Sequence, residues 1–312
     1  MPHHLQPGIL IAGPGSVGGA LAARWVLAGQ SVLLLSRDKA SETRLVRNGI
    51  FFTARNGSRR RAGGPKLQSA RRSGPRPCAA VFFCVKSKDI PDAVRSTRPW
   101  VGPATSIVGL QNGLGHEKTL HRAFGKIRTV LGSCYFAADR PAPFSVSNSW
   151  GNTITLAQTK DNRQAAATAR KLLLKGGWMV SLKNSEDRML WTKLCFNAAT
   201  NPLASLCAVP NGSLAENPAL KEIMLTVLAE TVAIATKSGH PPLYHDMDAL
   251  VVRSCQAAPL QRNSMLQDLA AGRKTEIESI AGPLLAAGCR AKTPAPLLTR
   301  LSRLIRRLER LT

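Results

Sequence analysis

Aromatic and acidic side chains are both scarce in this chain of 312 residues. Phe, Trp and Tyr make up only 5% of it, so leucine, valine, isoleucine and alanine must fill most of any core. Only 18 acidic residues stand against 43 Lys and Arg, which gives a formal net charge of +25. An excess of this size favours anionic partners, such as a phosphorylated cofactor, an acidic substrate or nucleic acid.

Long apolar runs and paired cysteines are also missing. No stretch of about 18 apolar residues is present, so the sequence predicts no membrane span and no membrane partner. The uncharged stretch 8–23 is rich in glycine and lacks a basic segment before it, which argues against a secretory signal peptide. The seven cysteines form no C-x-x-C motif, so we expect reduced thiols in a cytoplasmic protein, with neither a disulfide framework nor a metal site.

The apolar segments change their pattern along the chain. Runs of strand length occur at residues 8–12, 31–35, 81–85, 106–109, 131–137 and 153–157. The first two flank a helical pattern and predict a βαβ unit. From about Ser185 the pattern is helical. We therefore expect an α/β fold, with a Rossmann-type nucleotide-binding domain over residues 1–182 and an all-α domain over 183–312.

A glycine-rich turn follows the first expected strand. Its sequence is Gly13-Pro14-Gly15-Ser16-Val17-Gly18. In a dinucleotide site the first glycine permits the turn, the second lets the backbone approach the phosphates, and the third lets helix and strand pack closely. The motif alone is weak, and a purely structural turn is the alternative. Its place between a strand and a helix favours the dinucleotide interpretation.

The second expected strand ends in Ser36-Arg37-Asp38. An NAD site usually carries an acid at this point to accept from the ribose hydroxyls. Arg37 could instead pair with a 2′-phosphate, which predicts NADP(H) rather than NAD(H). Two alternatives stay open: Asp38 becomes the ribose acceptor if the register shifts, and Arg37 could be an ordinary exposed charge.

One polar stripe interrupts an apolar helical segment in the second half. Lys193, Asn197 and Asn201 are spaced four residues apart, so on a helix they share one narrow face. Buried amides and ammonium groups need partners, which suggests a binding or catalytic face. A hydrogen-bonded structural stripe or a solvent-facing side is the alternative. We expect Pro202 to break or kink this helix.

Five segments together resemble the 2-dehydropantoate 2-reductase (ketopantoate reductase) family in order and spacing, and they span nearly the whole chain. They are the glycine-rich turn, Val85-Lys86-Ser87, Gln111 to Gly115, the segment from Lys193 to Leu203 with Asn211-Gly212, and Ser264 to Asp268 with Thr275-Glu276. The lysine segment and the segment beginning at Ser264 are the most specific. The chain departs from the family pattern before the third strand, where it is rich in arginine and where Cys78 stands in place of a frequent acid.

The resemblance implies NADPH-dependent reduction of 2-dehydropantoate to pantoate, a step of pantothenate and coenzyme A biosynthesis. It implies that Lys193 is the proton donor and that Glu276 is an active-site acid that also contacts the cofactor. Asn197, Asn201, Asn211 and Ser264 match the substrate-binding positions of the family. Lys86, Asn112 and Ala138 match its cofactor contacts. Many members of the family act on substrates that are not proven, so a reductase of another 2-keto acid is the first alternative.

Two basic regions are not explained by this function. Residues 55–76 carry eight basic side chains and no acid, and we interpret them as a solvated surface loop, with a loop that holds ragged short strands as the alternative. In the last helix we expect Leu297, Leu301, Leu304, Leu308 and Leu311 to face the core, opposite Arg300, Arg303, Arg306, Arg307 and Arg310. A second alternative is therefore a Rossmann-scaffold sensor or nucleic-acid-binding protein. We expect no nucleic-acid partner despite the charge, and the sequence leaves the oligomeric state open, a homodimer included.

Overall fold

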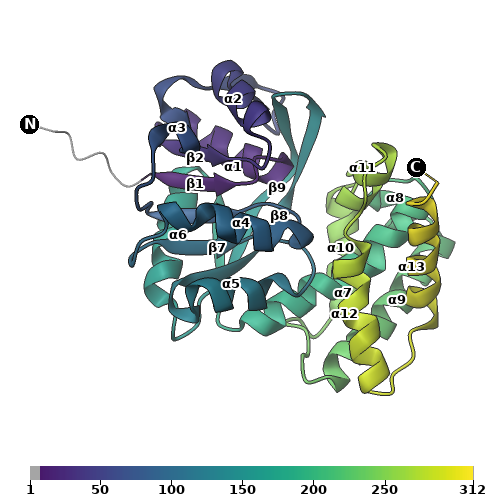
Figure 1. Cartoon of the computed structure of the whole chain (residues 1–312). Helices are drawn as coiled ribbons and strands as arrows, with labels where there is room; N and C mark the ends of the chain where they lie inside the picture. Colours follow the sequence, from purple (N-terminus) through teal and green to yellow (C-terminus); the bar gives the residue numbers. More distant parts are fainter. Residues whose placement is uncertain (1–7, 312) are drawn as a thin grey trace, which may run out of the picture. The chain divides into compact units, whose positions relative to one another are not determined.

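The computed structural model describes residues 8–311, which form two compact units (Figure 1). The first unit comprises the chain up to Gln111 together with His116–Glu186. The second comprises the short segment Asn112–Gly115 together with the chain from Asp187 onward. A short turn in the middle of the sequence thus belongs to the second unit.

Six parallel strands organise the first unit. They are β1 (Ile9–Ala12), β2 (Val32–Leu35), β5 (Leu67–Ser69), β6 (Ala80–Phe83), β7 (Ser106–Gly109) and β8 (Thr129–Ala142). Their spatial order is β5-β2-β1-β6-β7-β8, with every neighbouring pair parallel. Counted within this set, the order is third, second, first, fourth, fifth, sixth, which is the order of a Rossmann fold. The expected α/β class is confirmed.

The sheet continues beyond β8. There β9 (Ser145–Ala157) is antiparallel to β8, and both β3 (Ile50–Thr53) and β10 (Met179–Lys183) are parallel to β9. At the edge, β4 (Arg59–Ala62) is antiparallel to β3.

The basic segment 55–76 is not a plain surface loop but holds short strands, the alternative that the sequence left open. It holds the edge strand β4, the strand β5 and the short helix α3 (Ala70–Ser73). Three exposed arginines occupy β4, so the strand carries no apolar alternation that could reveal it. Backbone pairing with β3 and the packing of the Arg59 guanidinium over the Phe51 ring, 5.0 Å from its centroid, hold it in place.

Helices cover this sheet and supply much of its core. They are α1 (Ser16–Leu27), α2 (Lys39–Asn48), α4 (Ile90–Thr97), α5 (His116–Phe124) and α6 (Arg163–Lys175). Helix α1 is buried along most of its length because its small residues allow close packing on the sheet, while Trp25 fills the space beside Phe82 at 4.8 Å between ring centroids. The large side chain of Trp25 fills a volume that would otherwise need several aliphatic side chains.

The second unit is entirely helical, as expected. Its helices are α7 (Glu186–Leu206), α8 (Asn211–Glu216), α9 (Pro218–Lys237), α10 (Met247–Ala257), α11 (Ser264–Ala270), α12 (Ile277–Arg290) and α13 (Pro296–Leu308). Of the two outcomes expected at Pro202, a break or a kink, the structure excludes the break, because α7 continues to Leu206. The helix is buried nearly all round, so tertiary packing outweighs the missing backbone donor.

The expected face of the last helix is wrong in detail. Leu304 and Leu311 are 41% and 80% exposed, whereas Leu298, Leu301, Ser302 and Ile305 are buried. The buried positions follow helical spacing, but Ile305 and not Leu304 continues the stripe. Grouping the leucines alone shifted the predicted face by about one residue. The arginines remain largely exposed, and Arg306 forms an ion pair with Glu278 at 2.6 Å.

Within residues 8–311, no helix is long and apolar enough to cross a bilayer. The same residues contain no group of three or more His, Cys, Asp or Glu side chains that could hold a metal ion. All seven cysteines are free thiols.

Candidate functional site

A cavity of about 410 Å³ opens at the carboxyl ends of β1, β2 and β6. The order of the sheet reverses between β1 and β6, and a crevice at such a point is where Rossmann folds bind their ligands. Its wall includes Gly13, Pro14 and Gly15 after β1, Arg37 after β2, and Lys86 after β6. These predicted cofactor residues are thus brought together by the first unit alone.

The glycine-rich turn has the local geometry that a dinucleotide site requires. Gly13 has a φ of +91°, and a Cβ atom there would lie 2.5 Å from Val85 Cγ1. A Cβ on Gly18 would lie 2.3 Å from the Gly13 carbonyl oxygen, so this glycine is needed for α1 to pack on the turn. A Cβ on Gly15 would meet nothing within 4 Å, which leaves the backbone open to a close ligand.

The beginning of α1 suits an anion. Gly15 provides no side-chain cap, and the first turn, formed by Ser16, Val17 and Gly18, carries no acidic residue. The first backbone N–H groups of a helix lack partners within the helix and carry partial positive charge. The turn and the helix therefore fit the pyrophosphate of a dinucleotide.

Alanine at Gly15 should affect dinucleotide binding, whereas alanine at Gly18 should affect the stability of the protein. Gly15→Ala should leave the melting temperature within about 2 °C of wild type, since its Cβ has open space, but weaken dinucleotide binding at least about tenfold. Gly18→Ala should cost about 1–3 kcal/mol of unfolding free energy, since its Cβ meets a backbone oxygen. Thermal denaturation and cofactor titration check both effects, and a Gly15→Ala protein that binds like wild type would contradict this assignment.

Arg37 and Asp38 have different surroundings at the end of β2. The Arg37 side chain is 84% exposed, lines the cavity and lies 3.5 Å from the Asp89 carboxylate. Asp38 caps α2 by accepting from the Ala40 N–H at 2.9 Å. Its side chain also accepts from the Ser41 hydroxyl, which lowers the pKa of this exposed carboxyl below its ordinary value. Capping gives Asp38 a structural role that competes with ribose binding.

A second group of predicted residues meets in the helical unit. Asn197 on α7 is 4% exposed, and its Nδ2 donates to Asn112 Oδ1 at 3.3 Å. The Nδ2 of Asn112 in turn donates to Glu276 Oε2 at 3.3 Å. Asn112 reaches this place because Gly113, with a φ of +82°, brings its turn against the Ser279 carbonyl of α12. Three distant segments thus form one polar cluster.

Lys193 lies one helical turn before Asn197 on the same face of α7. Its Nζ lies 4.9 Å from the centroid of the Phe196 ring, within the range of a cation–π contact. Asn201, one turn beyond Asn197, is also 4% exposed and accepts from the Thr200 hydroxyl at 3.2 Å. Lys193, Asn197 and Asn201 therefore form the single stripe that their spacing predicts, and its two amides are buried.

The two remaining predicted substrate residues lie beside a third, which the prediction missed. Asn263 is 5% exposed, caps α11 through the Leu266 N–H and donates to Asn211 Oδ1 at 3.2 Å. Asn211 is buried as well, whereas Ser264, the first residue of α11, is exposed. A Cβ on Gly212 would lie 2.5 Å from Pro259, so this glycine lets the loop before Asn263 approach α8.

Six predicted cofactor contacts are not part of the cavity wall: Ser16, Val17 and Gly18 in the first turn of α1, Glu276, Ala138 and Asn112. Ala138 is in β8, where it packs on the core of the first unit opposite Asn148 of β9. Asn112 belongs to the polar cluster of the second unit. The cavity wall also includes four charged residues that were not predicted as site residues, namely Arg71, Asp89, Asp92 and Arg140. Arg71 is one of the eight basic residues of segment 55–76, and only its position in the fold distinguishes it.

The thiols near these groups are poor nucleophiles. Burial raises the pKa of Cys84, in the cavity wall, well above its ordinary value, and the neighbouring Cys134 raises it further. Burial likewise raises the pKa of Cys195, on α7, to about 12. Both side chains therefore stay protonated at neutral pH, which argues against covalent cysteine chemistry at either place.

Known proteins of similar sequence and structure match both units. A family model described as "Ketopantoate reductase PanE/ApbA" matches residues 9–161, and "Ketopantoate reductase PanE/ApbA C terminal" matches residues 187–309. The 2-dehydropantoate 2-reductase of Halobacterium salinarum is 27% identical over 97% of this chain and 99% of its own length. The corresponding protein of Archaeoglobus fulgidus is 26% identical over 90% of each chain.

Solved structures resemble the chain over nearly its full length. A PanE/ApbA family ketopantoate reductase from Ralstonia eutropha is 25% identical, with a TM-score of 0.83 over 97% of this chain and 98% of that one. D-mandelate dehydrogenase, solved with NADH and anilino(oxo)acetate, has a TM-score of 0.85 over 97% of this chain and 98% of that one. Its 21% identity shows a shared fold alone.

The Rossmann sheet, the glycine-rich turn and the cavity define an oxidoreductase that uses a nicotinamide dinucleotide and acts on a small molecule. The chain belongs to the ketopantoate reductase family, because family models cover both of its units.

Proposed function

We propose that this enzyme reduces 2-dehydropantoate to pantoate with NADPH, a step of pantothenate biosynthesis. The observation that carries the proposal is the polar cluster of Asn112, Asn197 and Glu276. Lys193 lies one helical turn before Asn197 on α7. Curated relatives over the whole chain length bear the name of this activity.

The residues divide the chemistry between them. A bound reduced nicotinamide would supply a hydride to the keto carbon. Lys193 then gives a proton to the keto oxygen and stabilises the negative charge that develops there. Asn197 and Asn201 hold polar groups of the substrate, together with Asn211, and Ser264 binds its carboxylate. Glu276 accepts a hydrogen bond from Asn112, and this bond fixes the position of the Glu276 carboxylate in the cluster.

A substrate panel tests the proposal directly. NADPH oxidation should be fastest with 2-dehydropantoate, when it is compared with pyruvate and 2-ketoisovalerate at equal concentration. The 2-keto acid that corresponds to mandelate belongs in the panel, because D-mandelate dehydrogenase shares the fold. If that acid has the highest kcat/KM, the chain is a reductase of another 2-keto acid, and the proposed substrate is wrong.

Arg37 should determine much of the cofactor preference. Its guanidinium lines the cavity at the end of β2, where a 2′-phosphate would add about two negative charges. Arg37→Ala should therefore raise the KM for NADPH at least about tenfold while changing the KM for NADH less than about twofold. Steady-state kinetics with both cofactors measure this, and equal changes for the two would refute the role.

A further inference from the structure

Arg71 is the one side chain of the basic segment 55–76 that lines the cavity of the glycine-rich turn. It lies in the short helix α3, directly after β5. The chemistry proposed above gives it no role. It nevertheless places a second guanidinium in the cavity wall, in addition to that of Arg37.

The topology of the sheet explains why these two arginines meet. Strands β2 and β5 are parallel neighbours, with Leu34 paired to Ser69. Arg37 follows Leu34 by three residues, and Arg71 follows Ser69 by two. Because parallel strands end at the same edge of the sheet, both side chains emerge at the carboxyl ends of their strands, and both line the cavity beside the point where the strand order reverses.

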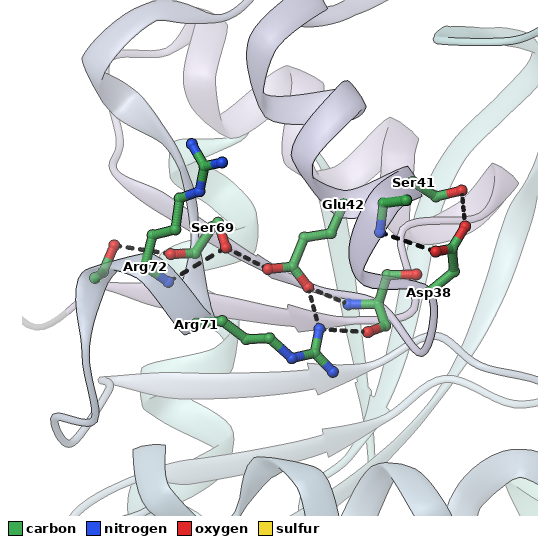
Figure 2. Close-up of polar contacts among 9 residues, drawn as sticks. Asp38, Ser41, Glu42, Ser69, Arg71 and Arg72 are labelled. Atoms are coloured by element: carbon green, nitrogen blue, oxygen red, sulfur yellow. Dashed lines mark hydrogen bonds and ion pairs between the residues drawn. The ribbon is translucent and has the colours of Figure 1, made fainter.

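Arg71 is held far more firmly than Arg37. Its Nη1 donates both to the Ser36 carbonyl oxygen and to Glu42 Oε2, each at 2.8 Å. Glu42 is 1% exposed and also accepts from the Ser36 N–H at 2.9 Å and from the Ser69 hydroxyl (Figure 2). Two serines at the ends of neighbouring strands thus orient Glu42, and Glu42 orients Arg71.

The remaining donors of Arg71 suit an anion. In residues 8–311, its hydrogen bonds are all made by Nη1, so Nε and Nη2 have no protein acceptor, and the side chain is 32% exposed. A guanidinium whose orientation is already fixed loses little conformational entropy when it binds. Its planar donors match the oxygens of a phosphate group.

We propose that Arg71 is a second ligand for the 2′-phosphate of the cofactor and that Glu42 is the residue that positions it. The inference rests on the proposed use of NADPH. Arg37, exposed and paired only loosely with Asp89, supplies a mobile charge, while Arg71 supplies a fixed fork. The preference for NADP(H) over NAD(H) then depends on two arginines, Arg37 after β2 and Arg71 after β5.

Isothermal titration calorimetry on the whole protein tests whether Arg71 binds the 2′-phosphate. The probes are NADP⁺, NAD⁺, adenosine 2′,5′-bisphosphate and adenosine 5′-monophosphate. Arg71→Ala should weaken the two ligands that carry a 2′-phosphate about tenfold to a hundredfold and change the other two less than about twofold. Arg71→Lys should recover only part of the loss, since a lysine cannot form the fork.

Arg72 provides a matched control on the same helix. Figure 2 shows its side chain extending away from Glu42 and Arg71, and only its backbone N–H contacts Ser69. Arg72→Ala removes the same charge from the same short helix and should leave all four affinities unchanged. If it weakens NADP⁺ as much as Arg71→Ala does, general electrostatic attraction explains the effect, and the assignment of Arg71 is wrong.

The outcomes separate this inference from the proposed function. If the wild-type protein binds NADP⁺ no more tightly than NAD⁺, the proposed cofactor is wrong. If it prefers NADP⁺ but Arg71→Ala weakens both equally or neither, the inference alone fails. Glu42→Gln should weaken NADP⁺ selectively and add nothing to Arg71→Ala in the double variant; an equal loss of NAD⁺ would show that Glu42 only supports the fold.

Discussion

Replacing Lys193 with alanine will lower kcat for keto-acid reduction at least about a hundredfold, the low end of what a general acid contributes. The keto oxygen gains negative charge as it accepts the hydride, and without the ammonium group no other basic side chain stands on the stripe of α7 to neutralise it. The loss should appear in kcat rather than in cofactor affinity, because every residue lining the cavity of the glycine-rich turn belongs to the first unit.

Lys237→Ala serves as the matched control for this substitution. Lys237 ends α9 in the same unit and is exposed, so its loss removes one ammonium group from the same domain without touching the stripe. Its kcat should equal that of wild type, and both variants should keep the wild-type melting temperature within about 2 °C, as expected for residues that are not buried. If Lys193→Ala retains kcat within about threefold of wild type, Lys193 is not the proton donor.

Much of the first unit could be predicted because its central strands are buried on both faces. All four residues of β1 and of β2 are buried, so they form short continuous apolar runs between turn residues. The glycine-rich turn was predictable because its three glycines fall within six residues, between an apolar strand and a helical pattern. The stripe on α7 needed only helical spacing.

Other features depend on pairs of residues far apart in the sequence. Glu42 and Arg71 are separated by 29 residues, and Asn211 and Asn263 by 52, so no local pattern could link them. Strand β4 could not be located within segment 55–76 because an exposed edge strand of three arginines shows no apolar alternation. These residues become informative only after the parallel order of the sheet and the packing of the helices are known.

Acid should destabilise this protein through one buried histidine, His116 at the start of α5. It is 2% exposed, and neither ring nitrogen has a hydrogen-bond partner in the described residues. Burial lowers the pKa of His116 from its ordinary 6.5 to about 4; the Glu117 carboxylate, 3.9 Å away, opposes this shift, and His121 adds to it. The folded state therefore keeps the ring neutral where the unfolded chain would protonate it.

The sign of the effect follows from proton counting. Between pH 6.5 and about 4 the unfolded chain binds one proton more than the folded protein, so acid favours unfolding. His116 should contribute a loss of about 3 kcal/mol in unfolding free energy between pH 7 and pH 4, at about 1.4 kcal/mol for each unit of pKa. Denaturant unfolding at a series of pH values measures it.

His116→Leu should remove this contribution, because the substitution takes away the titrating ring. The other acid-sensitive groups remain in both proteins, so the comparison isolates one residue. His245→Gln is the control, since His245 is exposed and its loss should leave the pH dependence of wild type intact. If wild type and His116→Leu lose the same free energy between pH 7 and pH 4, the ring has found a proton acceptor in solution, and the buried neutral state of His116 is wrong.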